Sequence, residues 1–323
     1  MSLYLGLDCG GTKTAALIMD AAGAERGRGR GGPGNVAQSD DATLAQSLRT
    51  AVREACAEAG LSADATRFAG VCAGVAGYSV EDRRAAFEFL LRANVPVEAE
   101  NPTARYRVEP DYVIAYWGAT HGEPGIVVIA GTGAVAYGRN AEGQTHREDG
   151  LGYLLGDRGS GFHLGLRVLG YTLEQIEQGR TDALTQAVQE FTGARSRNEI
   201  LRWLYRDFSP ARVAGLAPVV GALAEAGDAA ARAHVAEMAR QLRHSVWAVR
   251  HKLRLPLDTP IYPLGGLWQI GAFLREEFAL PRWRSPESPV EPAETWLDAR
   301  FPIAVPKSDA AYGAALLAKG GKE

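Results

Sequence analysis

Residues 8–14 combine a carboxylate with glycines, hydroxyls and a lysine. Asp8 closes an apolar stretch that predicts a strand, and the turn after it holds Gly10, Gly11, Thr12 and Lys13. Glycines let backbone N–H groups approach phosphate oxygens, the threonine and lysine add donors, and Asp8 can hold Mg²⁺ through water. The segment predicts a phosphate-binding turn, although it lacks the Walker A spacing. Taken alone, an ordinary glycine hairpin explains it equally well.

Two further glycine turns follow predicted strands. Gly131-Thr132-Gly133 matches a dinucleotide-binding fingerprint only weakly, because a strand and not a helix comes next. It can instead act as a second glycine hairpin that clamps a polyphosphate opposite the first. The pair Gly265-Gly266 precedes a predicted helix and can receive the adenosine end of a nucleotide, although such a pair is more often a tight turn.

Hydrophobic periodicity and turn residues predict the elements that hold these turns. The first half contains, in chain order, strand 3–8, strand 14–19, helix 41–59, strand 68–73, helix 80–93 and a strand end at 107–111. The second half contains strand 126–130, strand 135–137, a loop around Gly143, a mainly helical region 160–254, strand 260–264, helix 267–278, loop 281–292, strand 302–305 and helix 309–318. The strand-turn-strand opening therefore occurs twice. The glycine and arginine run 27–32 predicts a solvated strand edge in preference to a nucleic-acid-binding segment.

Length and composition set limits on the function. The 323 residues predict about two domains, and 46% hydrophobic residues suffice for buried cores. A net charge of −3 argues against nucleic acid or an anionic membrane as the partner and favours a small molecule. The three cysteines form no metal or disulfide motif, and neither a leader nor an 18-residue apolar window is present. We expect a cytoplasmic protein without a membrane anchor.

Five segments in a fixed order resemble the N-acetylglucosamine kinase group, which is related to the BadF/BcrA ATPases within the superfamily of actin, hexokinase and Hsp70. They are residues 5–14, 129–133, 156–161, 264–266 and 306–315. The resemblance implies an α/β fold with two actin-like, ribonuclease H-like domains flanking a central cleft. It places the first domain at 1–114, with the terminal helix 308–323 packing back on it, and the second, with a helical insertion, at 115–307. It also implies ATP and Mg²⁺.

The resemblance further implies a role for each matching residue. Asp111 is the expected catalytic base, and Asp8 is the expected Mg²⁺ residue, through water. The expected sugar-binding residues are Asn35, Asp111, Gly150, Leu151, Gly152 and Asp157. The expected ATP-binding residues are Gly10, Gly11, Thr12, Lys13, Gly131, Thr132, Gly133, Gly215, Gly265 and Gly266.

Local sequence offers plainer interpretations of four of these residues. Asp111 follows Pro110 and can be a turn residue, and Gly-Asn at Asn35 is a common turn signal. Asp157 can be the N-cap of a helix starting near residue 160, and Gly215 can interrupt a helix.

The resemblance, with these residues, implies an ATP-dependent amino-sugar kinase that phosphorylates the 6-hydroxyl of N-acetylglucosamine or glucosamine. Three departures from the family pattern occur. The one at Ala134 lies in the second phosphate turn and is compatible with ATP. Those at residues 149–152 and 112–113 flank the expected sugar pocket and leave N-acetylmuramic acid open as the substrate. A BadF/BcrA-type ATPase that activates an acyl-CoA dehydratase would need clustered cysteines. A sugar-responsive repressor would need a helix-turn-helix before the first strand, and a catalytically dead nucleotide binder stays open. A homodimer is compatible with the resemblance, and residues 112–120 and Ser308 are hinge candidates.

Overall fold

The computed structural model describes residues 2–78, 81–98, 105–280 and 300–321. The chain divides into two compact units, the first formed by residues 1–123 with 305–323 and the second by residues 124–304. A boundary after residue 114, as expected from the sequence, would cut helix α3 (Asp111–Thr120), and the division lies instead at Glu123. The predicted loop 281–292 lies outside the described residues.

The first unit is built on a five-stranded sheet in the order β3-β2-β1-β4-β5. Its strands are β1 (Leu3–Cys9), β2 (Thr14–Asp20), β3 (Glu25–Gly31), β4 (Gly70–Val75) and β5 (Tyr106–Pro110). The first three strands are antiparallel, whereas β1, β4 and β5 run parallel. Residues at the carboxyl ends of the three parallel strands therefore meet at one edge of the sheet.

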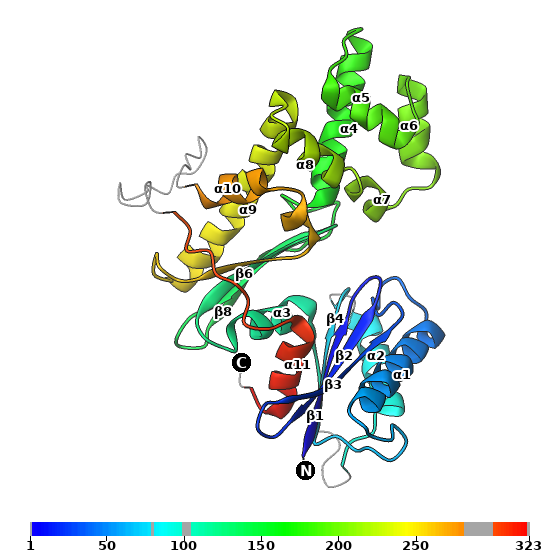
Figure 1. Ribbon diagram of the computed structural model, residues 1–323, viewed down its shortest axis with the longest axis vertical. Coiled ribbons are helices and arrows are strands. Elements are labelled where there is room, and N and C mark those ends of the chain that lie inside the picture. The colour runs from blue at the N-terminus through cyan, green and yellow to red at the C-terminus, as the bar shows by residue number, and fades with distance from the viewer. Residues whose placement is uncertain (1, 79–80, 99–104, 281–299, 322–323) are drawn as a thin grey trace. The chain divides into compact units, whose positions relative to one another are not determined.

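Four helices cover the two faces of this sheet. Helices α1 (Asp41–Glu58) and α2 (Glu81–Asn94) lie on one face, and α3 and α11 (Ala310–Lys319) on the other (Figure 1). The apolar spacing of α1 buries Leu44, Leu48 and Val52, and the Asp40 side chain caps the helix by accepting a hydrogen bond from the backbone N–H of Thr43 at 2.7 Å. The helix predicted at 41–59 is thereby confirmed.

The glycine and arginine run forms the edge strand β3, as predicted, and its glycines face α1. A Cβ atom added at Gly29 would lie 2.0 Å from the carbonyl oxygen of Ala51, and one at Gly27 would lie 2.4 Å from that of Ala55. Alternate glycines therefore let helix and strand backbones touch, while the arginines between them point the other way.

The second unit carries a four-stranded sheet in the order β8-β7-β6-β9. The strands are β6 (Gly125–Ala130), β7 (Ala134–Arg139), β8 (Thr145–Asp149) and β9 (Ile261–Leu264). The sequence placed a loop where β8 forms, because the strand is polar and lies at the sheet edge, where no apolar alternation marks it. The side chain of Asn140 closes the β7–β8 turn by accepting from the backbone N–H of Gln144 at 2.8 Å.

Helices form most of the rest of the second unit, as the sequence predicts for residues 160–254. They are α4 (Gly161–Glu177), α5 (Ala183–Thr192), α6 (Arg197–Arg206), α7 (Pro210–Ala214), α8 (Ala217–Glu225), α9 (Ala229–Leu253) and α10 (Ala272–Ala279). The predicted stripe of α9 is buried in the core of this unit, including Leu242, Val246 and Val249.

Two predictions near the end of the chain are wrong. The helix expected at 267–278 is a 3₁₀ turn, η1 (Gly266–Gln269), followed by α10, with a break at Gly271. The Glu225 carboxylate packs against the break: it accepts from the backbone N–H of Phe273, in the first turn of α10, at 2.6 Å, and a Cβ at Gly271 would lie 2.3 Å from it. The strand expected at 302–305 is reduced to a single bridge between Ile303 and Ile261.

No single helix in the described ranges is both long enough and apolar enough to cross a membrane. Only when taken together are the helical segments 210–225 and 229–253 long and apolar enough, and the chain bends by 118° between them. Many of their apolar side chains are buried in the core of the second unit.

Candidate active site

Two aspartates lie at the carboxyl edge of the first sheet. Asp8, next to last in β1, pairs with Gly74 of β4, and Glu109 of β5 pairs with the same glycine. Asp111 lies two residues after Glu109 and is the first residue of α3. From the sequence we expected it at the end of a strand or in a turn, and both of these interpretations are wrong. The parallel direction of the strands brings both carboxylates to one edge, the usual place for a ligand in such sheets.

The surroundings of the two carboxyl groups favour their neutral forms. Burial, followed by the negative charges of Asp111 and Asp309, raises the pKa of Asp8 to about 6 against the opposing effect of Lys13. Burial raises the pKa of Asp111 to about 6 as well, although its carboxylate accepts a hydrogen bond from the backbone N–H of Tyr112 at 2.8 Å. The Asp111 residue is nevertheless open to solvent. A solvent-accessible carboxyl with such a pKa can exchange protons near neutral pH.

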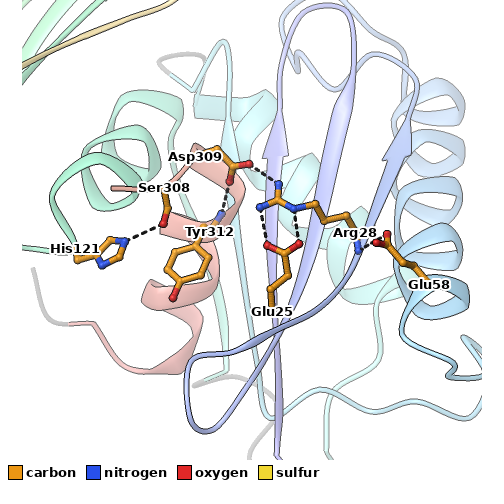
Figure 2. A network of polar contacts seen from close by, with 7 residues as sticks. All are labelled: Glu25, Arg28, Glu58, His121, Ser308, Asp309 and Tyr312. Carbon is orange, nitrogen blue, oxygen red and sulfur yellow. Dashed lines mark hydrogen bonds and ion pairs between the residues drawn. The ribbon is translucent and has the colours of Figure 1, made fainter. Parts of the chain in front are cut away.

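A third carboxylate, Asp309, lies within electrostatic range of Asp8 and was missed in the sequence. It caps α11 by accepting from the backbone N–H of Tyr312 at 2.9 Å. Figure 2 shows the Arg28 guanidinium, from β3, pairing with both Asp309 and Glu25. The available signal was an aspartate directly before an alanine-rich helix, which indicates an N-cap but not proximity to β1.

The first glycine turn connects β1 to β2 and presents its tip to solvent. The backbone N–H of Gly10 donates to the carbonyl oxygen of Lys13 at 3.0 Å, which closes the turn. Gly11, Thr12 and Lys13 are all exposed. The donors that a phosphate would need are therefore accessible.

Asn35 lies close to this turn. The neighbouring Gly34 donates its backbone N–H to the carbonyl oxygen of Gly10 at 2.8 Å. The Asn35 side-chain oxygen accepts from the backbone N–H of Ala37 at 2.9 Å, so the predicted turn role is real. Within the described part of the chain, its side-chain nitrogen has no hydrogen-bond partner and can still serve a ligand.

The second glycine turn joins β6 to β7 and is fixed by the start of α4. Within the turn, the backbone N–H of Gly131 donates to the carbonyl oxygen of Gly133 at 2.8 Å. The backbone N–H groups of Gly161 and Phe162 donate to the carbonyl oxygens of Gly131 and Thr132 at 2.8 and 3.3 Å. The N-terminus of α4 therefore fixes the turn by donating hydrogen bonds to the carbonyl groups of the turn.

Asp157 connects this turn to the loop after β8. The backbone N–H groups of Ala134 and Gly152 act on its carboxylate and lower its pKa. Burial, followed by the charge of Asp149, raises its pKa in spite of those two donors. The N-cap of α4 is Ser160, so the helix-cap interpretation of Asp157 is wrong.

The other predicted sugar-binding residues form the start of that loop. Gly150 and Gly152 both have left-handed backbone conformations, with φ of 69° and 83°. Leu151 between them is 55% exposed. A Cβ at Gly150 would lie 2.9 Å from a methyl group of Val135, so the loop begins directly beside β7.

The remaining predicted ATP contacts of the second unit gather around the same turn. A Cβ at Gly265 would lie 2.4 Å from the carbonyl oxygen of Ala130, the residue before the turn. Gly215 is the C-cap of α7, so the predicted interruption of a helix at this residue is confirmed. Its neighbour Ala214 would contact a Cβ added at Gly161, with 3.4 Å between the two carbons. The second unit therefore assembles residues that are up to 134 positions apart, from Gly131 to Gly265.

Glycine turns at strand ends and a carboxylate pair, carried by two α/β units, are the features that the actin-like fold leads us to expect. Residues 5–293 match the BadF/BadG/BcrA/BcrD ATPase family, and the chain belongs to this family. Membership of an ATPase family means that the chain uses ATP.

Curated relatives and a solved structure are similar over most of the chain. The N-acetylmuramic acid/N-acetylglucosamine kinase of Clostridium acetobutylicum is 26% identical over 325 residues, covering 99% of each chain. The N-acetyl-D-glucosamine kinase of Dictyostelium discoideum is 27% identical, covering 82% of this chain and 85% of its own. The crystal structure of a candidate N-acetylglucosamine kinase from Chromobacterium violaceum is 27% identical, covers 99% of both chains and has a TM-score of 0.74. The actin-like fold with two α/β units is thereby confirmed.

Proposed function

We propose that this protein is an ATP-dependent amino-sugar kinase, which transfers the γ-phosphoryl group to the 6-hydroxyl of N-acetylglucosamine or glucosamine. The observation that carries the proposal is the solvent-accessible Asp111, whose raised pKa of about 6 suits a general base, at the same sheet edge as Asp8 and the first glycine turn. The names of the relatives supply the class of sugar.

Asp111 acts as the base in this proposal. Its carboxylate accepts the proton of the attacking sugar hydroxyl as the oxygen bonds to the γ-phosphorus and the bond to the β-phosphate oxygen breaks, which releases ADP. The proton and the phosphoryl group are then both accounted for in the products, protonated Asp111 and the sugar phosphate. Phosphoryl transfer asks little covalent chemistry of the protein, so positioning and charge carry the rest.

Asp8 fits a hydrated Mg²⁺ ion. The raised pKa of Asp8 reflects its burial and the concentration of negative charge beside it, which a cation would relieve. Among the described residues, no group of three or more His, Cys, Asp or Glu side chains is placed to enclose a metal. Mg²⁺ commonly keeps several waters and binds through one or two carboxylates plus substrate phosphates. When bound, the ion would offset the charge of those phosphates.

Within each unit we assign phosphate donors and sugar-binding groups separately. We assign ATP phosphates to the exposed backbone and side-chain donors of residues 10–13 and to residues 131–133, and the adenosine end to Gly215, Gly265 and Gly266. In the first unit we assign a sugar contact to the Asn35 side-chain nitrogen, which has no hydrogen-bond partner among the described residues. In the second unit we assign sugar contacts to Asp157 and the loop residues 150–152. Unmade polar contacts would then reject sugars that lack the matching group.

The activator of an acyl-CoA dehydratase is the less suitable alternative. Cys9, Cys56 and Cys72 form no disulfide within the described part of the chain, and all three are buried in the first unit. Burial raises the pKa of the Cys9 and Cys56 thiols, which disfavours the thiolate that an iron–sulfur cluster requires. Buried thiols also suit a reducing cytoplasm.

ADP release measured with Mg-ATP and a panel of sugars tests the function. The panel contains N-acetylglucosamine, glucosamine, N-acetylmuramic acid, N-acetylmannosamine, glucose and a no-sugar control. We expect strong release with one or more of the first three and background release with glucose or no sugar. Equal release with and without sugar would point to an ATPase, and no release with any sugar would point to a nucleotide-binding protein without turnover.

The pH profile should show an acidic limb. Because the carboxyls of Asp8 and Asp111 both have a pKa of about 6, we expect kcat/KM for the sugar to fall below about pH 6 as the base becomes protonated. The two groups interact, so the midpoint belongs to the pair.

Acid unfolding through these groups cannot explain such a limb. Their folded-state pKa values lie above the ordinary value of 3.8, so their contribution to stability is present at low pH and is lost as pH rises toward 6. Rates between pH 5 and 8.5, with the midpoint of thermal unfolding measured at each pH, provide the check. A flat kcat/KM over that range would remove the raised-pKa carboxylate from the mechanism.

A further inference from the structure

Two aspartates at the ends of the 150–156 loop adopt a backbone conformation that is rare for residues other than glycine. Asp149, the last residue of β8, has a φ of 65°, and Asp157 has a φ of 56°. Only two other non-glycine residues of the described chain have positive φ, His121 and Arg254, and each is a helix C-cap, where this conformation is common. The aspartates are not helix caps, so other contacts must hold them.

The Asp149 carboxylate holds the two ends of the loop together. One of its oxygens accepts from the backbone N–H of Asp157 at 2.6 Å, and the other accepts from that of Arg158 at 2.9 Å. The approach is close enough that a Cβ at Gly156 would lie 2.2 Å from the first oxygen. Bonds from amides to an ionised carboxylate are among the stronger hydrogen bonds in proteins.

Asp157 connects Asp149 to the second glycine turn. With its backbone fixed, Asp157 directs its carboxylate to the backbone N–H groups of Ala134 and Gly152. A Cβ at Gly133 would lie 2.6 Å from one of its oxygens. A carboxylate offers about four acceptor positions, so these two amides leave capacity for a sugar hydroxyl.

From these contacts we propose that Asp149 is a positioning residue for sugar binding, which acts only by orienting Asp157. This inference rests on the proposed kinase function, because it takes Asp157 to bind the sugar. Asp149 itself contacts no substrate. Its carboxylate fixes the backbone of Asp157 in the left-handed conformation, and that conformation sets where the Asp157 carboxylate meets both the sugar and the Ala134 amide.

The test is a double-mutant cycle on sugar KM. Asp149→Gly removes the carboxylate, while glycine readily adopts a φ of 65° and so keeps the backbone path. We expect Asp149→Gly to raise sugar KM about tenfold in the wild-type background and less than twofold in an Asp157→Asn background. Asp149→Asn, which keeps one acceptor and tolerates the same φ, should fall between wild type and Asp149→Gly.

Three results would overturn the inference. They are an unchanged KM in Asp149→Gly, an equal rise in both backgrounds, or a rise in Asp149→Asn that matches Asp149→Gly. If Asp149→Gly does not fold, the Asp149→Asn cycle decides in its place, with a smaller expected rise in the wild-type background and none beyond Asp157→Asn.

Amide hydrogen exchange gives a readout that does not depend on turnover. Loss of the Asp149 carboxylate should accelerate exchange at the N–H groups of Asp157 and Arg158 at least tenfold, without a similar change in the centre of α9. Unaltered exchange at those two amides would contradict the inference. If wild-type protein showed this protection but no sugar-dependent ADP release, the proposed function would fail while the role of Asp149 in fixing Asp157 would stand.

Discussion

Asp111→Asn should lower kcat about 10³-fold and leave the KM for sugar and for ATP within about threefold of wild type. Asparagine keeps the shape of the side chain and can still accept the hydrogen bond from the Tyr112 backbone N–H, but it cannot take up a proton from the sugar hydroxyl. Steady-state kinetics with the preferred sugar and Mg-ATP measure the effect.

Glu109→Gln is the matched control for that variant. Glu109 lies two residues earlier, on the same strand end, and pairs with the Arg107 guanidinium. Removing its charge should change kcat less than twofold. Retention of more than a tenth of wild-type kcat in Asp111→Asn would exclude Asp111 as the base.

Thermal unfolding separates this loss of activity from a loss of structure. At pH 7.5 the Asp111 carboxyl is ionised, and its raised pKa means that the folded state disfavours that charged form. Asp111→Asn should therefore unfold at the same temperature as wild type or at a higher one. An inactive variant with a lower unfolding temperature would indicate structural damage instead.

Gly6→Ala should have the largest effect on stability. A Cβ at Gly6 would lie 2.1 Å from the carbonyl oxygen of Ala311 and 2.4 Å from the backbone nitrogen of Ala315, both in α11. Backbone atoms cannot swing aside as a side chain can, so α11 would have to move away from β1. We expect a loss of about 3 kcal/mol or more in the free energy of unfolding.

Gly170→Ala is the matched control, and this same glycine-to-alanine change should stabilise the protein. Gly170 lies within α4, and a Cβ there would have no atom within 4 Å. Alanine should stabilise this helix by up to about 1 kcal/mol. Urea unfolding followed by circular dichroism compares both variants with wild type, and a Gly6→Ala midpoint equal to that of wild type would show that α11 does not pack as described.

The strand-turn-strand openings were predictable because their signals are local. Aliphatic runs flank glycine turns in β1–β2 and in β6–β7, and capping residues mark α1 and α11. The polar edge strand β8 carries no such signal. At the break before α10 the first turn of the helix is bound by Glu225, which belongs to another helix and lies 48 residues away from the amide that it binds.

The candidate site could be proposed from the sequence where glycine turns and strand ends indicate it, but not where side chains meet only in the folded protein. Asp309 comes within electrostatic range of Asp8 only after α11 packs on β1, some 300 residues later in the chain. Asp149 acts on amides eight and nine residues ahead through a folded loop. In the sequence, Asp149 was visible only as a departure from the family pattern.

The most direct test of the central claim is ³¹P nuclear magnetic resonance of the reaction with Mg-ATP and N-acetylglucosamine. We expect a phosphomonoester signal that correlates with the two protons on carbon 6 of the sugar and grows in step with ADP. Enzyme that hydrolyses ATP would yield inorganic phosphate with no sugar correlation. That result, or a phosphate on any other sugar carbon, would contradict transfer to the 6-hydroxyl.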